Sequence, residues 1–182
     1  MTVTATLGAC TATTTFTITI DDAGGLNWVN CPANITVGND VDKCGSNVVF
    51  STPVAEDNCN VVTVTRTAGL ASGSLFPLGT TTVTFLAADP TGNTATCQFT
   101  ITVTDMQTPT AVCQNISVNL NAAGQATITA AQIGGSSTDN CPAALTLSLS
   151  QTTFDCSHVG NNNVVLTVTD GAGNSSICNA TV

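Results

Sequence analysis

Aspartates in this chain stand at places that recur along the sequence. Asp57 and Asp89 lie in two separate turn-rich stretches, and Asp139 and Asp170 lie at the matching places about 80 residues later. Carboxylate oxygens are ligands that Ca²⁺ prefers, so aspartates brought together would predict a calcium site. An aspartate in a turn can also accept hydrogen bonds from its own backbone, and this alternative stays open.

Cysteine is the second residue type that could do chemistry. The chain has nine cysteines, and none of them stands in a C-x-x-C or Cys/His spacing typical of a zinc site. Four cysteines fall in each of two similar stretches, which allows two disulfides per stretch. Each disulfide would stabilise a small domain by roughly 2–4 kcal/mol, and disulfides persist in oxidising compartments. The cysteines therefore predict an extracellular protein.

Catalytic chemistry has few candidates in this sequence. His158 is the only histidine, and no nucleophile-elbow motif accompanies it. Glu56 and Asp57 are adjacent carboxylates, whereas a glycosidase needs two carboxylates that face each other across a cleft. We therefore expect no enzyme activity and no catalytic residue.

The stretch from Thr80 to Asp105 shows how these residues are positioned. Apolar residues alternate with threonines on both sides of the segment 89–93, Asp-Pro-Thr-Gly-Asn, which is typical of a tight turn. A period of two with many β-branched residues predicts two antiparallel strands with one buried face. Cys97 has the parity of Phe99 and Ile101, so its side chain should point into the core.

This pattern occurs twice. The segment Gly160–Cys178 repeats Gly79–Cys97, and Asp139-Asn140-Cys141 repeats Asp57-Asn58-Cys59. An internal repeat of about 80 residues predicts tandem modules. Short strands separated by turns indicate Ig-like or fibronectin-like β-sandwiches, among them a strand at 115–121.

The repeat divides the chain into three expected parts. Residues 1–22 resemble the last hairpin of a preceding, truncated module, residues 23–105 form one β-sandwich, and residues 106–182 form a second one, truncated at its last strand. Cys10 in the first part is then the odd cysteine and is expected to be unpaired.

The sandwich would bring the recurring aspartates to the module junctions. In such a fold the two loops that carry them lie at the N-terminal end, beside the preceding linker. The expected sets for a structural Ca²⁺ are Asp21, Asp22, Asp57 and Asp89 at one junction, and Asp105, Asp139 and Asp170 at the next.

Composition excludes several kinds of partner. Lys43 and Arg66 are the only basic residues, and the net charge at pH 7 is -9. Nucleic acid and anionic membranes both require Lys and Arg, so neither is expected as a partner. No run of about 18 apolar residues is present, so we expect no membrane insertion. Abundant threonine, valine and isoleucine without helical periodicity predict an all-β fold.

Several motifs together resemble a known family, the hyalin repeat. They are Cys31–Val37 (CPANITV), Pro53 with Asp57-Asn58-Cys59, Gly73–Gly79 (GSLFPLG), and Asp89-x-x-Gly92-Asn93 followed by Cys97–Val103. The resemblance covers residues 28–105. Residues 106–182 resemble a related repeat of giant surface and gliding-type adhesins of bacteria, although Phe154-Asp155-Cys156 replaces the Phe-Pro motif.

The resemblance implies a fibronectin-like, disulfide-stapled sandwich of extracellular adhesion and matrix proteins, without catalysis. It also implies a disulfide pairing, because hyalin repeats with two cysteines keep the equivalents of Cys31 and Cys97. The implied pairs are Cys31–Cys97, Cys44–Cys59, Cys113–Cys178 and Cys141–Cys156. Four cysteines allow three connectivities, so the second pair of each module depends on the first.

These observations predict a non-catalytic stalk or spacer of a long secreted or cell-surface adhesin, or of an extracellular fibre. Its partners would be neighbouring modules of the same chain and other copies in a fibre. One alternative is an adhesion module that binds an extracellular protein or glycan. Another is a filament subunit that assembles by β-strand addition. No cofactor is expected apart from the structural Ca²⁺.

Overall fold

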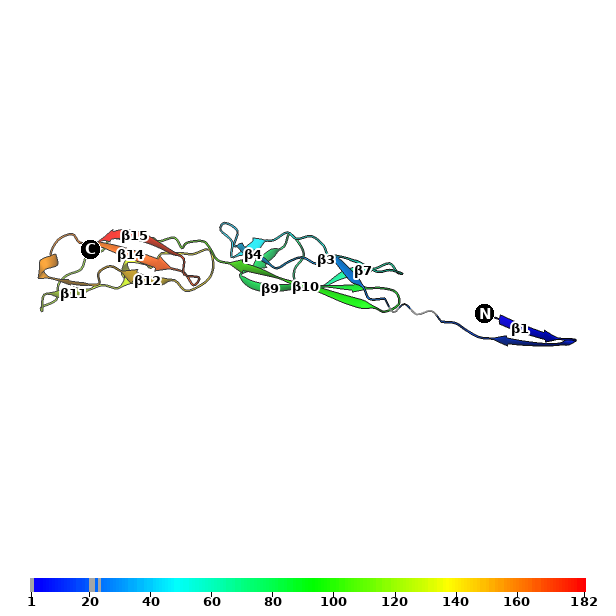
Figure 1. The fold of residues 1–182 in the computed structure, drawn as a ribbon. Coiled ribbons are helices and arrows are strands. Elements are labelled where there is room, and N and C mark those ends of the chain that lie inside the picture. The colour runs from blue at the N-terminus through cyan, green and yellow to red at the C-terminus, as the bar shows by residue number, and fades with distance from the viewer. Residues whose placement is uncertain (1, 20–21, 23) are drawn as a thin grey trace. The chain divides into compact units, whose positions relative to one another are not determined.

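The computed structural model describes residues 2–19, 22 and 24–182. In these residues strands dominate, and the helical elements are one short helix, α1 (Ala130–Gly134), and one 3₁₀ turn, η1 (Cys156–His158) (Figure 1). The expected all-β fold is confirmed. Within the described part of the chain, no helix has the length and apolar character needed to cross a membrane.

Contacts group the chain into two compact units. The first comprises Met1–Cys31, Pro53–Thr65 and Phe85–Cys97, and the second comprises Pro32–Thr52, Arg66–Thr84 and Gln98–Val182. These units do not follow the module boundaries expected after residues 22 and 105, which stay a prediction.

The N-terminal hairpin consists of β1 (Thr2–Leu7) and β2 (Cys10–Thr15). The strands are antiparallel, with Leu7 opposite Cys10, so the connecting loop is the two residues Gly8 and Ala9. Gly8 has a φ of 62°, a conformation that glycine adopts without the steric cost of a side chain. The expected hairpin is present, although its second strand ends at Thr15.

The longest strands form one four-stranded sheet. Its order is β4 (Ile35–Gly38), β10 (Thr94–Thr104), β9 (Gly79–Ala88) and β7 (Thr63–Ala68). β4 runs parallel to β10, and buried residues alternate along β9 and β10 as the period of two predicts. Cys97 is buried with Phe99 and Ile101, so the expected parity is confirmed.

Two short antiparallel pairs complete this part of the chain. They are β3 (Asn27–Asn30) with β6 (Val54–Glu56), and β5 (Gly45–Asn47) with β8 (Leu75–Pro77). Trp28 in β3 lies opposite Ala55 and is half-buried. Phe76 in β8 is completely buried and packs edge-on against Phe50, with ring centroids 6.4 Å apart. Strands of three residues are too short to show a period of two, which explains why the sequence does not reveal them.

The C-terminal stretch has two further sheets. One pairs β11 (Gln125–Thr127) with β13 (Thr153–Asp155), and the other has the order β12 (Thr146–Leu149), β14 (Asn163–Thr169), β15 (Ser175–Thr181). Their buried core consists of Ile128, Ile133, Phe154, Val164, Leu166, Val168 and Ala180. The prediction of a strand at 115–121 is wrong, because this segment is irregular in the structure. Its backbone contact with β15 is one hydrogen bond, from Ile116 N to Thr181 O at 3.1 Å, which is too few for a paired strand.

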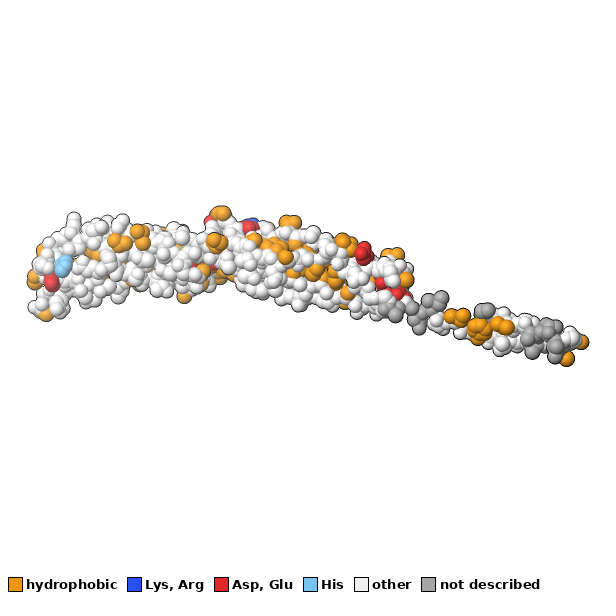
Figure 2. Space-filling model, viewed as in Figure 1, with side chains coloured by type: hydrophobic (Ala, Val, Ile, Leu, Met, Phe, Trp, Pro, Cys, Tyr) orange, Lys and Arg blue, Asp and Glu red, His pale blue; other side chains and the backbone are white. Residues whose placement is uncertain are grey.

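Uncharged polar groups and backbone cover most of the visible surface. Figure 2 shows little red or blue among the described residues, in keeping with a chain in which charged residues make up 7% of the sequence. On this face the described residues show no cluster of Lys and Arg side chains that would attract a polyanion.

Candidate cation and disulfide sites

Asp89 and Asp170 each hold the turn in which they lie. Asp89 Oδ1 accepts hydrogen bonds from the backbone N–H groups of Thr91, Gly92 and Asn93 at 2.8–2.9 Å, and Asn93 Nδ2 donates to Asp89 Oδ2 at 2.9 Å. Asp170 Oδ1 receives the backbone N–H groups of Ala172 and Asn174, both at 2.8 Å. The turn alternative thus describes Asp170, whereas Asp89 holds its own turn and also lies close to Asp22 and Asp57.

The same hydrogen bonds shift the acidity of both carboxyls. Burial raises the pKa of Asp89, but hydrogen bonds from Asn93 and Thr91 outweigh it and leave the pKa below its usual value. Burial likewise raises the pKa of Asp170, and donors led by Asn174 lower it overall. Both side chains are therefore carboxylates at neutral pH, engaged mainly with their own turns.

Three aspartates of the first unit lie close together. Asp22, Asp57 and Asp89 each offer a carboxylate oxygen, and these oxygens all lie within 4.8 Å of one another. Oxygens that share a Ca²⁺ at about 2.3–2.6 Å are separated by at most about 5 Å, so the spacing suits that ion. Asp21, the fourth residue of the expected set, lies outside the described residues.

Asp57 contributes the least satisfied oxygen of this cluster. Its Oδ2 accepts from the backbone N–H groups of Cys59 and Asn60, both at 2.9 Å. Its Oδ1 is buried and has no hydrogen-bond partner among the described residues. A buried carboxylate oxygen without a donor is costly, and a cation is one way to stabilise it.

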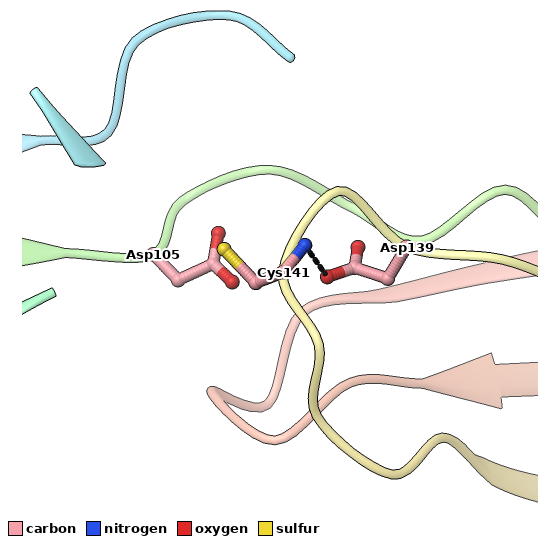
Figure 3. Close-up of side chains that lie close together, drawn as sticks. All are labelled: Asp105, Asp139 and Cys141. Atoms are coloured by element: carbon pink, nitrogen blue, oxygen red, sulfur yellow. Dashed lines mark hydrogen bonds between the residues drawn. The ribbon is translucent and has the colours of Figure 1, made fainter. Parts of the chain in front are cut away.

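The second expected set is only partly brought together. Figure 3 shows Asp105, Asp139 and Cys141 close together. One ligand atom of each lies within 4.8 Å of the other two, and Asp170 is not part of this group. The Cys141 sulfur is bonded to Cys44 and so offers no thiolate. Two carboxylates remain, those of Asp105 and Asp139. In Asp139, Oδ1 is buried without a partner among the described residues, and Oδ2 accepts a hydrogen bond from Cys141 N at 2.9 Å.

One disulfide closes nearly the whole of each repeat. Cys31 is bonded to Cys97 with a Cα–Cα distance of 5.8 Å, and Cys113 is bonded to Cys178 with a distance of 5.9 Å. Their sequence separations are 66 and 65 residues, so the pairs are equivalent in the two stretches. Both have the connectivity that the resemblance implies.

The other two implied pairs, Cys44–Cys59 and Cys141–Cys156, are not what the structure shows. Cys44 is bonded to Cys141, with 97 residues between them in sequence and a Cα–Cα distance of 4.9 Å. Cys59 and Cys156 are exposed and free, and so is Cys10, which was expected to be unpaired.

Local hydrogen bonds explain why Cys44 meets Cys141. Asn140 Nδ2 donates to the backbone oxygen of Lys43 at 3.0 Å, which brings the two loops together one residue before each cysteine. The linker, by which we mean the residues around Gln107 that join the two repeats, is held as well, since Asn39 Nδ2 and Asp42 N both donate to Gln107 Oε1 at 3.1 and 3.0 Å. Cys59 and Cys141 stand at matching positions of the two repeats, whereas Cys44 and Cys156 have no matching cysteine in the other repeat. This difference was the signal in the sequence that these four cysteines need not pair within each repeat.

His158 belongs to a cap and not to a catalytic triad. In η1, the backbone N–H of Ser157 and the His158 ring nitrogen Nδ1 both lie within hydrogen-bond distance of the same oxygen, Asp155 Oδ1, at 2.8 and 2.7 Å. Hydrogen bonds from the Ser157 hydroxyl and backbone, and then from His158, lower the pKa of Asp155 to about 2. Because the serine bonds directly to the aspartate, the histidine is not placed between them as in a triad.

An all-β chain with repeat-closing disulfides defines a class of protein, the disulfide-linked β-sandwich repeats. Comparison with known families narrows this class, because residues 28–103 match the HYR domain. The match supports an HYR domain in this part of the chain.

Curated relatives agree with the family match. Hyalin of Strongylocentrotus purpuratus is 37% identical over 114 residues, covering 57% of this chain and 9% of the relative. A sushi, von Willebrand factor type A, EGF and pentraxin domain-containing protein 1 of Rattus norvegicus is 30% identical over 155 residues, covering 82% of this chain and 4% of the relative. The chain thus spans less than a tenth of either relative.

Among solved structures, the protocadherin gamma B4 extracellular domain is similar over 94% of this chain and 36% of its own, at 11% identity and a TM-score of 0.43. Both curated relatives are animal proteins, so the expected bacterial setting is not supported. The HYR match and the disulfides indicate an extracellular module of the adhesion type, which is a non-enzymatic kind of domain.

Proposed function

We propose that this chain is a non-catalytic spacer segment of a longer extracellular adhesion protein, in which residues 23–105 and 106–182 are consecutive β-sandwich repeats. The observation that carries the proposal is the arrangement of the disulfides. The shortest covalent path from Cys31 to Cys178 runs through the Cys31–Cys97 and Cys113–Cys178 bonds. Only the residues between Cys97 and Cys113 remain to be stretched along that path.

This arrangement suits a segment that must keep its length under tension. Even if both repeats lost their folded structure, the polypeptide between the bonded cysteines could not extend. The Cys44–Cys141 bond and the hydrogen bonds of Gln107 add a second connection beside the linker. These contacts support the proposal that the partner of each repeat is the neighbouring repeat of the same chain.

Single-molecule pulling on the termini of the chain tests the proposal. Without reductant we expect the two disulfide-closed loops to release no length. With reductant each loop should release 66 or 65 residues, or about 230 Å at about 3.5 Å per residue. The double variant Cys44→Ser/Cys141→Ser is the matched control, because it leaves the short path intact and should extend like the parent. Full extension of the parent chain without reductant contradicts the proposal.

We also propose that Asp22, Asp57 and Asp89 take up a structural Ca²⁺. The supporting observations are the 4.8 Å spacing of their oxygens and the unpartnered Oδ1 of Asp57. Calcium should then raise the melting temperature reported by Trp28, and EDTA should reverse the change. Asp57→Asn should abolish the shift, while Asp155→Asn, a carboxylate of the η1 cap, should leave it unchanged. A melting curve of the parent that ignores calcium rules out the site.

A ligand-binding role has weaker support. The described surface has hollows of about 220 to 430 Å³, among them one lined by Phe154, His158 and Val159. Their size overlaps the roughly 300–1,000 Å³ that is usual for ligand sites, so size does not separate the two roles. The spacer role is preferred because the disulfide arrangement supports it directly.

A further inference from the structure

The Cys44–Cys141 bond has two structurally different halves. Cys141 belongs to an Asp-Asn-Cys turn, in which Asp139 Oδ2 accepts from the cysteine N–H at 2.9 Å and Asn140 reaches the backbone oxygen of Lys43. Cys44 instead comes directly before Gly45, the first residue of β5. One half is therefore a turn cysteine, and the other is a cysteine at the end of a paired strand.

The turn half occurs a second time, at Cys59. Asp57-Asn58-Cys59 has the same three residues, and Asp57 Oδ2 accepts from the Cys59 N–H at the same distance of 2.9 Å. Even the unpartnered oxygen recurs, since Oδ1 is buried without a donor in both Asp57 and Asp139. Cys59 is thus built like Cys141, but it is exposed and free.

The strand-end half also occurs a second time, at Cys156. The pair β11–β13 matches β5–β8, and Gly124 precedes β11 as Cys44 precedes β5. A Cβ built on Gly124 would lie 2.8 Å from the Cys156 sulfur. Cys156 directly follows β13, the strand that pairs with β11. Its sulfur therefore occupies the space that a cysteine side chain at position 124 would take. It too is exposed and free.

We propose that Cys156 and Cys59 are the two halves of a second cross-link between repeats, in which Cys156 of one copy bonds the Asp-Asn-Cys turn at Cys59 of another. Each bond forms when two thiols together lose two protons and two electrons. Glutathione disulfide, as a low-molecular-weight oxidant, takes up both and leaves as two glutathione thiols. The two halves are different residues of the same chain, so the contact is heterologous and can repeat from copy to copy into an open chain.

This inference rests on the proposed arrangement of repeats in series, but it can fail by itself. Pulling reports the bonds within one chain, whereas cross-linking reports the bonds between chains. A negative result for Cys59 and Cys156 would leave the covalent path from Cys31 to Cys178 unchanged.

Mixing two variants provides the test. Both variants and their parent carry Cys10→Ser, which removes the third exposed thiol. The first variant also carries Cys59→Ser, and the second also carries Cys156→Ser. Each is incubated alone and in equimolar mixture in a glutathione redox buffer, then separated on a non-reducing gel and mapped by mass spectrometry. The Cys10→Ser parent should form a ladder, the mixture should stop at a dimer joined by Cys156 and Cys59, and each variant alone should stay monomeric.

The ratio of products decides the outcome. Complementary surfaces should favour the Cys59–Cys156 dimer over either like-with-like dimer by more than about tenfold, which corresponds to about 1.4 kcal/mol. A statistical distribution of the three dimers, or free thiols at Cys59 and Cys156 throughout, would overturn the inference. Both serine substitutions replace exposed, unbonded side chains. An unchanged Trp28 unfolding curve confirms that the Cys59→Ser variant is folded, and an unchanged circular-dichroism melt confirms the same for Cys156→Ser.

Discussion

Removing the Cys31–Cys97 bond should strongly destabilise the repeat that contains it. The bond closes a loop of 66 residues, and in the chain-entropy model a loop of this length stabilises the folded state by roughly 4 kcal/mol. Substituting both cysteines with alanine also avoids a lone buried thiol, since Cys97 is only 2% exposed. With a denaturant dependence of about 1–3 kcal/mol per molar urea, the unfolding midpoint should fall by about 1.3–4 M.

Trp28 makes the assay specific for this repeat. It is the only tryptophan of the chain, and it lies three residues before Cys31, in a strand that ends at Asn30, so its fluorescence follows the unfolding of this repeat alone. The matched variant Cys113→Ala/Cys178→Ala removes a loop of 65 residues from the other stretch and should move the Trp28 transition much less. Cys10→Ala, which alters an exposed free cysteine, should leave the midpoint unchanged.

A shift of the Trp28 midpoint worth less than about 1 kcal/mol in the Cys31→Ala/Cys97→Ala variant would refute this reasoning. It would mean that the fold holds the two strand ends together without the covalent bond, or that the unfolded chain retains the contact.

Three further outcomes follow from the packing and the charges. Phe76→Ala removes a completely buried ring and should cost about 3–5 kcal/mol in urea unfolding; a loss below about 1 kcal/mol would contradict its place in the core. Gly134→Ala places a Cβ against Leu166 and should cost about 1–3 kcal/mol by overpacking, visible as a lower melting temperature, whereas an unchanged melt would contradict the close approach. The pKa of Asp155 is lowered from 3.8 to about 2, first by the Ser157 hydroxyl, so its ionised form stabilises the fold. That stability is complete above about pH 4 and is lost as the pH falls towards 2. A carboxyl titration by NMR should show this low midpoint, and Asp155→Asn should remove the associated acid sensitivity; a midpoint near 3.8 would contradict the cap.

The long hairpin could be predicted because its signal is local. Alternation of apolar and polar residues over ten-residue strands determines which face is buried, and the turn at Asp89 is determined by an aspartate, a glycine and an asparagine in order. Gly92 has a φ of 100°, so the residue type and the turn conformation agree. The three-residue strands β5 and β8 carry no such signal, because they are defined only by the partner that each finds in space.

The cation and disulfide sites divide in a similar way. Cys31 and Cys97 could be paired from the sequence because the resemblance and the inward parity of Cys97 point to the same bond. The Asp57 cluster was predicted in outline, since its members fall in loops that a sandwich gathers at one end. Asp170 was assigned to the second cluster, but its oxygens are engaged by its own turn.

By itself the sequence determined the all-β fold, the internal repeat and the inward face of the longest strands. All of these depend on residue type and spacing along one element or one repeat. The disulfide that closes each repeat was implied by the resemblance to the hyalin repeat, because four cysteines alone allow three connectivities. Only the tertiary structure decided that Cys44 meets Cys141 and that Cys59 and Cys156 stay free. That choice depends on which loops meet at the linker, where the amide of Asn140 reaches the backbone of Lys43 across 97 residues of sequence.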